Sequence, residues 1–295
     1  MVPFQANVPE VLEFLQSRLN LGQTFSTVKV CLAAISACHV GFEGETMGQQ
    51  PLVWRFMKDA MRLQKVSKPL FPSWGLAVVL DALCRQPFEP LGAVELKFPC
   101  LKTVLIVALT TSKRVSDIQA LSVGPECMRF AAGDKVMLKP NAAFVPKNLQ
   151  VVHTPAELVA FHPPPFASVE DERLNYLCPF RALRWYCQRT AAGRNTSLLF
   201  VSYGPGSNRT AVAGSTVSRW IVEAIRLAYA SRSVRVPEGL RAHSTRGVSA
   251  SWALSRGLRP GDLHGSELVV FFDFRGFLQP RRGSVCSGAC CFGCG

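Results

Sequence analysis

The chain has 295 residues, of which 48% are hydrophobic and 18% are charged, so it can bury a sizeable core and global disorder is excluded. It carries 33 lysines and arginines against 20 acidic residues, and this net charge of +13 favours a polyanionic partner, most simply nucleic acid. A basic protein without such a partner is the alternative. No uncharged apolar run reaches the roughly 18 residues of a membrane span. The first residues also lack a signal-peptide pattern, so we expect the 11 cysteines to be thiols in a reducing compartment.

The N-terminal part, residues 8–66, predicts three helices. Apolar residues recur at helical spacing from Val8 to Leu21, Thr24 or Ser26 can cap a second helix, and residues 52–66 form a third. In the third helix we expect Val53, Phe56, Met57 and Met61 to face inward, and Arg55, Lys58, Arg62 and Lys65 to face outward. This basic face is either a contact for backbone phosphates or an ordinary solvated surface.

Residues 67–74 contain two prolines and predict a linker to a larger domain, residues 75–256. Helices are expected in that domain at 75–85, 100–113, from Cys178 onward, at 214–230 and at 240–255. The second should bury a stripe of Leu101, Leu105, Ala108 and Leu109, and the third should bury Leu183, Trp185 and Tyr186. Ser215 or Thr216 should cap the fourth. Short β-prone segments at 127–131, 135–139 and 149–154 predict a small antiparallel sheet, and residues 198–203 are strand-like. The fold class is therefore mainly α with a small antiparallel β-sheet (α+β).

Two short segments carry the chemistry of this chain. One places Arg114 after an apolar helix, in Thr-Thr-Ser-Lys-Arg-Val-Ser-Asp, and the other is His-Ser-Thr-Arg-Gly, with His243 and Arg246 three residues apart. An arginine can donate two parallel hydrogen bonds to phosphate oxygens, and positions i and i+3 share a helical face. The three side chains can therefore grip one phosphodiester, whereas the same spacing turns Arg241 elsewhere. Either segment alone is typical of an ordinary surface; their combination with the basic charge favours the phosphate site.

The segment Ala108–Leu121 resembles the first conserved box of the tyrosine recombinases (the phage-integrase family), and His243–Gly247 resembles the second. The amino-acid sequences of 113–117 and 240–244 are most similar to those of recombinases of DIRS-type retrotransposons. Residues 1–66 resemble the helical, SAM-like core-binding domain of that family, although the segment starts abruptly. The resemblance extends over roughly residues 8–256, so residues 75–256 would form an incomplete catalytic domain.

The resemblance implies a role for each site residue. Arg114 and Arg246 would bind the scissile phosphate, His243 would assist in proton transfer and phosphate contact, and a lysine of the β-hairpin would protonate the leaving 5′ oxygen. Lys139 is the first choice for that lysine and Lys147 the alternative. No metal or other cofactor is implied, because the arginines neutralise the developing charge. A tyrosine would attack phosphorus to form a 3′-phosphotyrosyl intermediate.

The nucleophile is missing from the place where the family has it. No tyrosine follows Tyr229, and residues 257–295 diverge from the family pattern. A shift of reading frame explains this: with suitable codons, the bases for 267–280 read one position later encode a tryptophan and a terminal Phe-Tyr-Ser. The coding DNA after the codon for Gly257 tests this hypothesis. Four cysteines of the tail could supply thiolates to zinc, but eight residues leave little fold around a metal, and none is expected (Cys286, Cys290, Cys291 and Cys294).

The leading hypothesis is a DNA-binding, tyrosine-recombinase-like protein of mobile-element origin. The family reaction would be DNA strand cleavage and rejoining, as in recombination and integration, and it would be lost here with the nucleophile. Double-stranded DNA would be the partner, with a homo-oligomer on DNA and no membrane, and a nuclear location is implied by the substrate alone. The alternatives are an active recombinase with a nucleophile supplied in trans, a non-catalytic helical interaction module, and a conceptual translation without a stable product.

Overall fold

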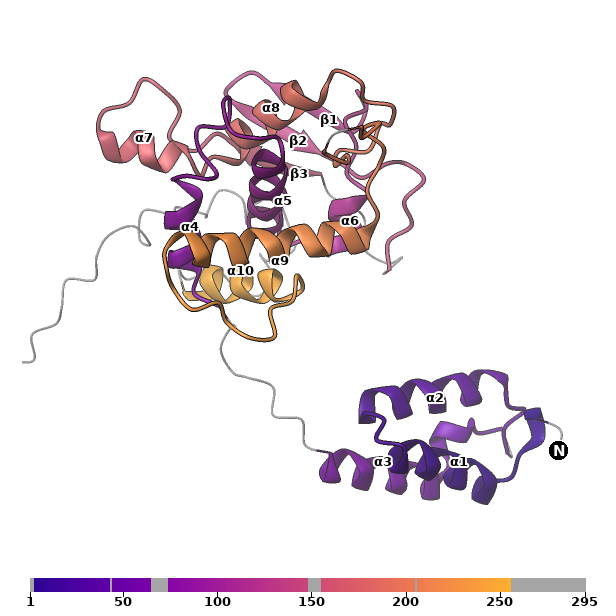
Figure 1. The fold of residues 1–295 in the computed structure, drawn as a ribbon. Helices are drawn as coiled ribbons and strands as arrows, with labels where there is room; N and C mark the ends of the chain where they lie inside the picture. The colour runs from indigo at the N-terminus through magenta and orange to yellow at the C-terminus, as the bar shows by residue number, and fades with distance from the viewer. Residues whose placement is uncertain (1–2, 43, 65–73, 148–154, 205, 256–295) are drawn as a thin grey trace, which may run out of the picture. The chain divides into compact units, whose positions relative to one another are not determined.

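The computed structural model describes residues 3–42, 44–64, 74–147, 155–204 and 206–255. The chain divides into two compact units, Met1–Leu70 and Phe71–Gly295, which are considered separately (Figure 1). The predicted linker falls largely on residues 65–73, which lie outside the described residues.

Unit 1 contains helices α1 (Val8–Asn20), α2 (Phe25–Cys38) and α3 (Pro51–Leu63), with short 3-10 turns η1 (Pro3–Gln5) and η2 (Met47–Gln49). The side chain of Asn7 caps α1, and Thr24 caps α2, as one of the two predicted alternatives. Apolar side chains of the three helices and η2 meet in one small core, formed by Val11, Leu15, Val28, Leu32, Met47 and Val53. The predicted helical organisation of this segment is therefore confirmed.

Helix α3 differs from the prediction in its inward face. Val53 is buried as expected, but Met61 is 52% exposed, and the preceding residue, Ala60, takes the core position. Ala60 follows Val53 by seven residues, almost two full turns, whereas Met61 is rotated about 100° further round the helix. Arg55, Lys58 and Arg62 are exposed, as predicted.

Unit 2 is mainly helical and carries one small sheet (Figure 1). Its helices are α4 (Leu76–Leu83), α5 (Lys97–Thr111), α6 (Val115–Gln119), α7 (Val169–Asn175), α8 (Pro179–Thr190), α9 (Gly214–Ser231) and α10 (Ser244–Ser255). Strands β1 (Met128–Ala131), β2 (Lys135–Leu138) and β3 (Ala156–Val159) form an antiparallel sheet in the order β1-β2-β3. This arrangement confirms the predicted fold class.

The third strand of the sheet is β3, Ala156–Val159, which was not predicted as a strand. The segment that was predicted, 149–154, lies outside the described residues. In the β2–β3 register, Ala156 and Leu158 lie opposite Leu138 and Val136, and all four are buried. Burial of one face therefore fixes the register of this strand pair.

Three further expectations needed correction. Trp185 is 37% exposed on α8 and lies against Gly92, whereas Leu183 and Tyr186 are buried as expected. Helix α9 begins after Ala213 rather than at a serine or threonine cap. Residues 198–203 form isolated bridges to Ser122 and Ala211 in place of a regular strand.

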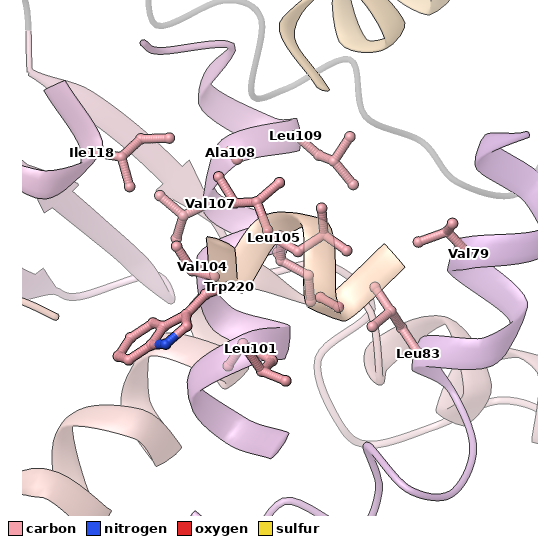
Figure 2. Packing of buried hydrophobic residues seen from close by; sticks show 14 of the residues in the cluster. Val79, Leu83, Leu101, Val104, Leu105, Val107, Ala108, Leu109, Ile118 and Trp220 are labelled. Carbon is pink, nitrogen blue, oxygen red and sulfur yellow. The ribbon is translucent and has the colours of Figure 1, made fainter. Parts of the chain in front are cut away.

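Helix α5 is the axis of unit 2. Every residue from Pro99 to Thr110 is buried, so the predicted apolar stripe is only part of a helix that is enclosed on all sides. Helices α6, α8, α9 and α10 all contact it. Figure 2 shows side chains of α4, α6 and α9, represented by Val79, Ile118 and Trp220, around the leucines and valines of α5.

A buried ion pair crosses this core. The ammonium group of Lys102, on α5, is fully buried and donates hydrogen bonds to the carboxylate of Glu89 (2.5 Å) and the carbonyl of Leu83 (2.7 Å). Arg181 of α8 donates to both oxygens of Glu89, at 2.6 and 3.0 Å. Burial by itself would raise the pKa of Glu89, but the hydrogen bond from Arg181 and the charge of Lys102 outweigh burial and lower it.

No described helix is long and apolar enough to cross a bilayer.

We predict that Glu89→Ala destabilises unit 2 severely. The substitution leaves the buried ammonium group of Lys102 and the partly buried guanidinium group of Arg181 without their carboxylate, and loss of one partner of a buried pair typically lowers the free energy of unfolding by about 3–5 kcal/mol. Urea unfolding followed by circular dichroism measures the change, with Glu126→Ala, at an exposed position, as the control expected within about 0.5 kcal/mol of the parent chain. A loss below about 1 kcal/mol for Glu89→Ala would show that the pair is not needed.

Candidate phosphate-binding site

Arg114 is placed by the sharp turn that ends α5. Ser112 adopts a left-handed conformation (φ 47°), which ends α5 and lets the chain enter α6 three residues later. Arg114 is the N-cap of α6, and the carboxylate of Asp117 accepts a hydrogen bond from its backbone N–H at 3.1 Å. Ile118, 1% exposed, anchors α6 in the core. The acidic residue of this motif therefore holds the backbone of Arg114, while the arginine side chain is exposed.

The second motif differs locally from the prediction. Helix α10 begins at Ser244, so His243 lies in the turn that precedes the helix rather than within it. The hydroxyls of Ser244 and Thr245 donate to the carbonyls of Arg241 and Ala242, both at 2.6 Å, and thereby fix this turn. His243 is exposed at the helix N-terminus, an end that favours anions through its free N–H groups and dipole.

Helix α10 is oriented by its buried face. Thr245, Val248 and Trp252 are buried against the core, and the hydroxyl of Ser249, fully buried, donates to the carbonyl of Thr245 at 2.9 Å. Arg246, one position beyond Thr245, is half-buried. The burial of one face thus leaves the edge of the helix that carries Arg246 available to a ligand.

The segment that opens unit 2 braces this site. The indole N–H of Trp74, itself 3% exposed, donates a hydrogen bond to the hydroxyl of Ser244 at 2.9 Å. The next residue, Gly75, donates its backbone N–H to the hydroxyl of Tyr229 at 2.7 Å. Trp74 and Gly75 therefore tie the first turn of α10 to the C-terminal end of α9.

A cleft of about 640 Å³ brings the two motifs to one surface. Val115, the residue after Arg114, and His243 both line it, together with residues of α9. Arg241 also lines the cleft, contrary to the prediction that it points elsewhere, because residues 241–243 are not helical and helical spacing does not apply to them. Arg246 is not among the lining residues.

The cationic groups of the site are not consumed by internal contacts. Among the residues that the structure describes, neither the guanidinium groups of Arg114 and Arg246 nor the ring of His243 forms a hydrogen bond or an ion pair. These contacts would otherwise compete with an external anion.

The lysines of the β2–β3 connection have different relations to the site. The backbone of Lys139 accepts a hydrogen bond from Ser122, three residues after α6, at 3.4 Å, and the side chain is exposed. Lys147 is exposed further along the same connection. The choice between these two lysines stays a prediction.

Lys113 is a further lysine at the site that the sequence reasoning passed over. It directly precedes Arg114 and is half-buried, and burial lowers its pKa while the charge of Asp117 opposes the shift. A charged residue two positions after the apolar run that ends α5 was the available signal.

The tyrosines of the chain are committed to other contacts. Tyr186 is buried and its hydroxyl accepts a hydrogen bond from the backbone of Val201, and the hydroxyl of Tyr229 accepts that of Gly75. Tyr176 donates to Glu172 at 3.0 Å. Tyr203 stacks on Trp220 with ring centroids 4.9 Å apart, and burial raises its pKa to about 12. None of these four tyrosines lines the cleft.

Two other predictions fall outside this site. The divergent tail and its four cysteines belong to residues 256–295, which lie outside the described residues. In the described ranges, no group of three or more histidine, cysteine, aspartate or glutamate side chains could hold a metal ion.

Comparison with known proteins relates the fold to solved structures. Two structures of the Tn1549 transposon integrase in complex with circular intermediate DNA are similar to this chain, with TM-scores of 0.54 and 0.52 at 11% sequence identity. The matches cover 93% and 94% of this chain and 80% and 81% of the integrase chains. No protein-family model and no curated protein matches the sequence. The chain therefore has a fold like that of this integrase, with little sequence identity to it.

We predict that Trp74→Phe loosens the first turn of α10. Phenylalanine keeps most of the ring volume but removes the N–H donor to Ser244, and a lost hydrogen bond of this kind typically lowers stability by about 1 kcal/mol. Hydrogen–deuterium exchange measures the effect as faster exchange in 244–248. Ser244→Ala also removes the hydrogen bond to the carbonyl of Arg241, so in a double-mutant cycle the two substitutions should be less than additive by about the value of the shared Trp74–Ser244 bond. Full additivity would contradict the coupling, and Trp185→Phe, at a half-exposed position, is the matched control.

Proposed function

We propose that this chain is a DNA-binding protein of the tyrosine-recombinase type, of mobile-element origin, that grips a backbone phosphate but does not cleave DNA. Arg114 and Arg246 hold the non-bridging oxygens of one phosphate, and His243 contacts the same group. Lys139, or alternatively Lys147, lies over the leaving oxygen. Double-stranded DNA is the partner.

One observation carries the proposal. Val115, which follows Arg114, and His243 line the same cleft, although the two motifs are more than a hundred residues apart in sequence. The two motifs can meet only if the fold brings α6 and the turn before α10 together. A recombinase-type fold would do so in order to place both motifs at one phosphate. The similarity to a DNA-bound transposon integrase supports the same fold assignment.

Electrostatics support phosphate as the ligand. The chain has an excess of 13 positive charges, and the cations at the site are not paired with described carboxylates. Guanidinium groups donate paired hydrogen bonds to phosphate oxygens, and a helix N-terminus adds backbone dipoles of the same sign. Contact with a nucleic-acid backbone follows from these groups without any base recognition.

The proposed loss of cleavage follows from the tyrosines. An attacking hydroxyl must reach phosphorus within the site, and the four tyrosines are buried, hydrogen-bonded or stacked away from the cleft. A nucleophile supplied in trans by a second subunit is the alternative to be tested.

We predict that Arg114→Gln and Arg246→Gln each weaken binding to a 30-base-pair duplex. A hydrogen bond to a charged group contributes about 1.5–3 kcal/mol, so the Kd should rise about 10- to 100-fold. Because both arginines share one phosphate, the double variant should reduce the slope of log K against log salt by about 1. Fluorescence anisotropy at several salt concentrations measures both quantities.

Arg129→Gln is the matched control for this measurement, since Arg129 is an exposed arginine on β1 that does not line the cleft. Equal weakening by Arg129→Gln would reduce the effect to net charge. Wild-type protein that fails to bind duplex DNA at low salt would refute the proposal.

We predict that the chain forms no covalent adduct with nicked suicide substrates. Such a substrate traps a phosphotyrosine because the cleaved strand diffuses away before religation. Denaturing electrophoresis of protein mixed with the substrate reads out the adduct. A stable adduct would overturn the proposed inactivity and favour a nucleophile in trans, and loss of that adduct in Arg114→Gln would place the reaction at this site.

A further inference from the structure

The cleft beside His243 carries three arginines that the phosphate grip does not use. Arg219 and Arg226 come from α9 and Arg241 from the turn before α10, and all three are exposed. Across the described ranges, their guanidinium groups form no hydrogen bond or ion pair. They are therefore available to an external anion.

The acidic residue of the cleft does not cancel this charge. Glu223 lies between the two α9 arginines in sequence, and its carboxylate pairs with the ammonium group of Lys97 at 2.5 Å. Lys97, at the start of α5, thus neutralises the carboxylate that would otherwise pair with a guanidinium group. The three arginines leave a local excess of positive charge in a hollow of about 640 Å³.

The spacing of these arginines suits a chain of phosphates rather than one compact anion. Arg219 and Arg226 are seven residues apart on one helix, which is two turns and about 10 Å along the axis. One strand of duplex DNA presents a phosphate about every 3.4 Å of its axis. Two guanidinium groups at this spacing reach phosphates about three nucleotides apart.

We infer that this cleft is a second DNA-backbone site, in which Arg219, Arg226 and Arg241 bind phosphates that flank the one held by Arg114, His243 and Arg246. The inference rests on the proposed function and extends it. A flanking site fixes the direction in which the strand leaves the central phosphate. Its phosphate contacts would add to the affinity for duplex DNA that Arg114, His243 and Arg246 provide.

The test compares two triple variants with the same loss of charge. The cleft variant combines Arg219→Gln, Arg226→Gln and Arg241→Gln. The control variant combines Arg129→Gln, Arg184→Gln and Arg235→Gln, at positions that are also exposed but do not line the cleft. Binding to the 30-base-pair duplex is measured by anisotropy from low to moderate salt. Circular dichroism verifies that both variants fold. If the glutamine cleft variant does not fold, a cleft variant with lysines at the same three positions is compared instead; it keeps the positive charge but loses the paired hydrogen bonds of the guanidinium groups.

The cleft variant should bind at least about tenfold more weakly than the control variant, and the magnitude of its salt slope should fall by about 2–3, one phosphate contact per arginine. Equal binding by the two triple variants, in a protein whose binding still depends on Arg114 and Arg246, would overturn this inference and leave the proposed function standing. No DNA binding by the wild-type chain would overturn both.

A competitor separates nucleic acid from an acidic protein as the occupant. Polyglutamate is titrated against each variant. Loss of polyglutamate binding in the cleft variant, with duplex binding equal to that of the control variant, would assign the cleft to an acidic polypeptide and refute the DNA inference. Loss of duplex binding with no effect on polyglutamate supports it.

Discussion

The enclosure of α5 is the constraint on which unit 2 depends. A helix with twelve consecutive buried residues must have neighbours on every side, and it obtains them from α6, α8, α9 and α10. The elements that carry the candidate site are thus the walls of the core. Arg114 follows the end of α5 by three residues, and α10, which begins one residue after His243, packs directly against the same helix. The hydrophobic effect thereby positions polar groups that have no direct contact with each other.

A buried charge makes this arrangement specific. Close packing already opposes displacement of α5, and Lys102 adds a further cost, because it cannot leave Glu89 without becoming a buried, unpaired charge. Glu89 is held in turn by Arg181 and by the backbone N–H of Leu91, so one carboxylate links α5, α8 and the segment after α4. The register of α5, and with it the position of its end beside Arg114, follows from this network.

The proposed function separates two parts of phosphoryl chemistry. The electrostatic part would be the exposed Arg114 and His243 and the half-buried Arg246, on elements held by Trp74 and by the cap that Asp117 provides. The covalent part would require a free hydroxyl near the cleft. The hydroxyls of Tyr176, Tyr186 and Tyr229 form hydrogen bonds elsewhere, and Tyr203, whose ring packs on Trp220, does not line the cleft. A surface of this kind can retain affinity for a nucleic-acid backbone after loss of cleavage, because affinity depends on charge and spacing rather than on the nucleophile.

The sequence alone determined most of the helices, the fold class and the two motifs, since helical periodicity, caps and charge are local properties; the short helix α7 was not predicted. Thr24 as a cap and the apolar run of α5 are examples. Tertiary structure decided which of several similar residues is used. Ala60 rather than Met61 enters the core, and Ala156–Val159 pairs with β2 through two buried residues, because burial is set by partners distant in sequence. The start of α10 at Ser244, fixed by hydroxyls and the Trp74 indole, brings Arg241 into the cleft, which no helical spacing could predict.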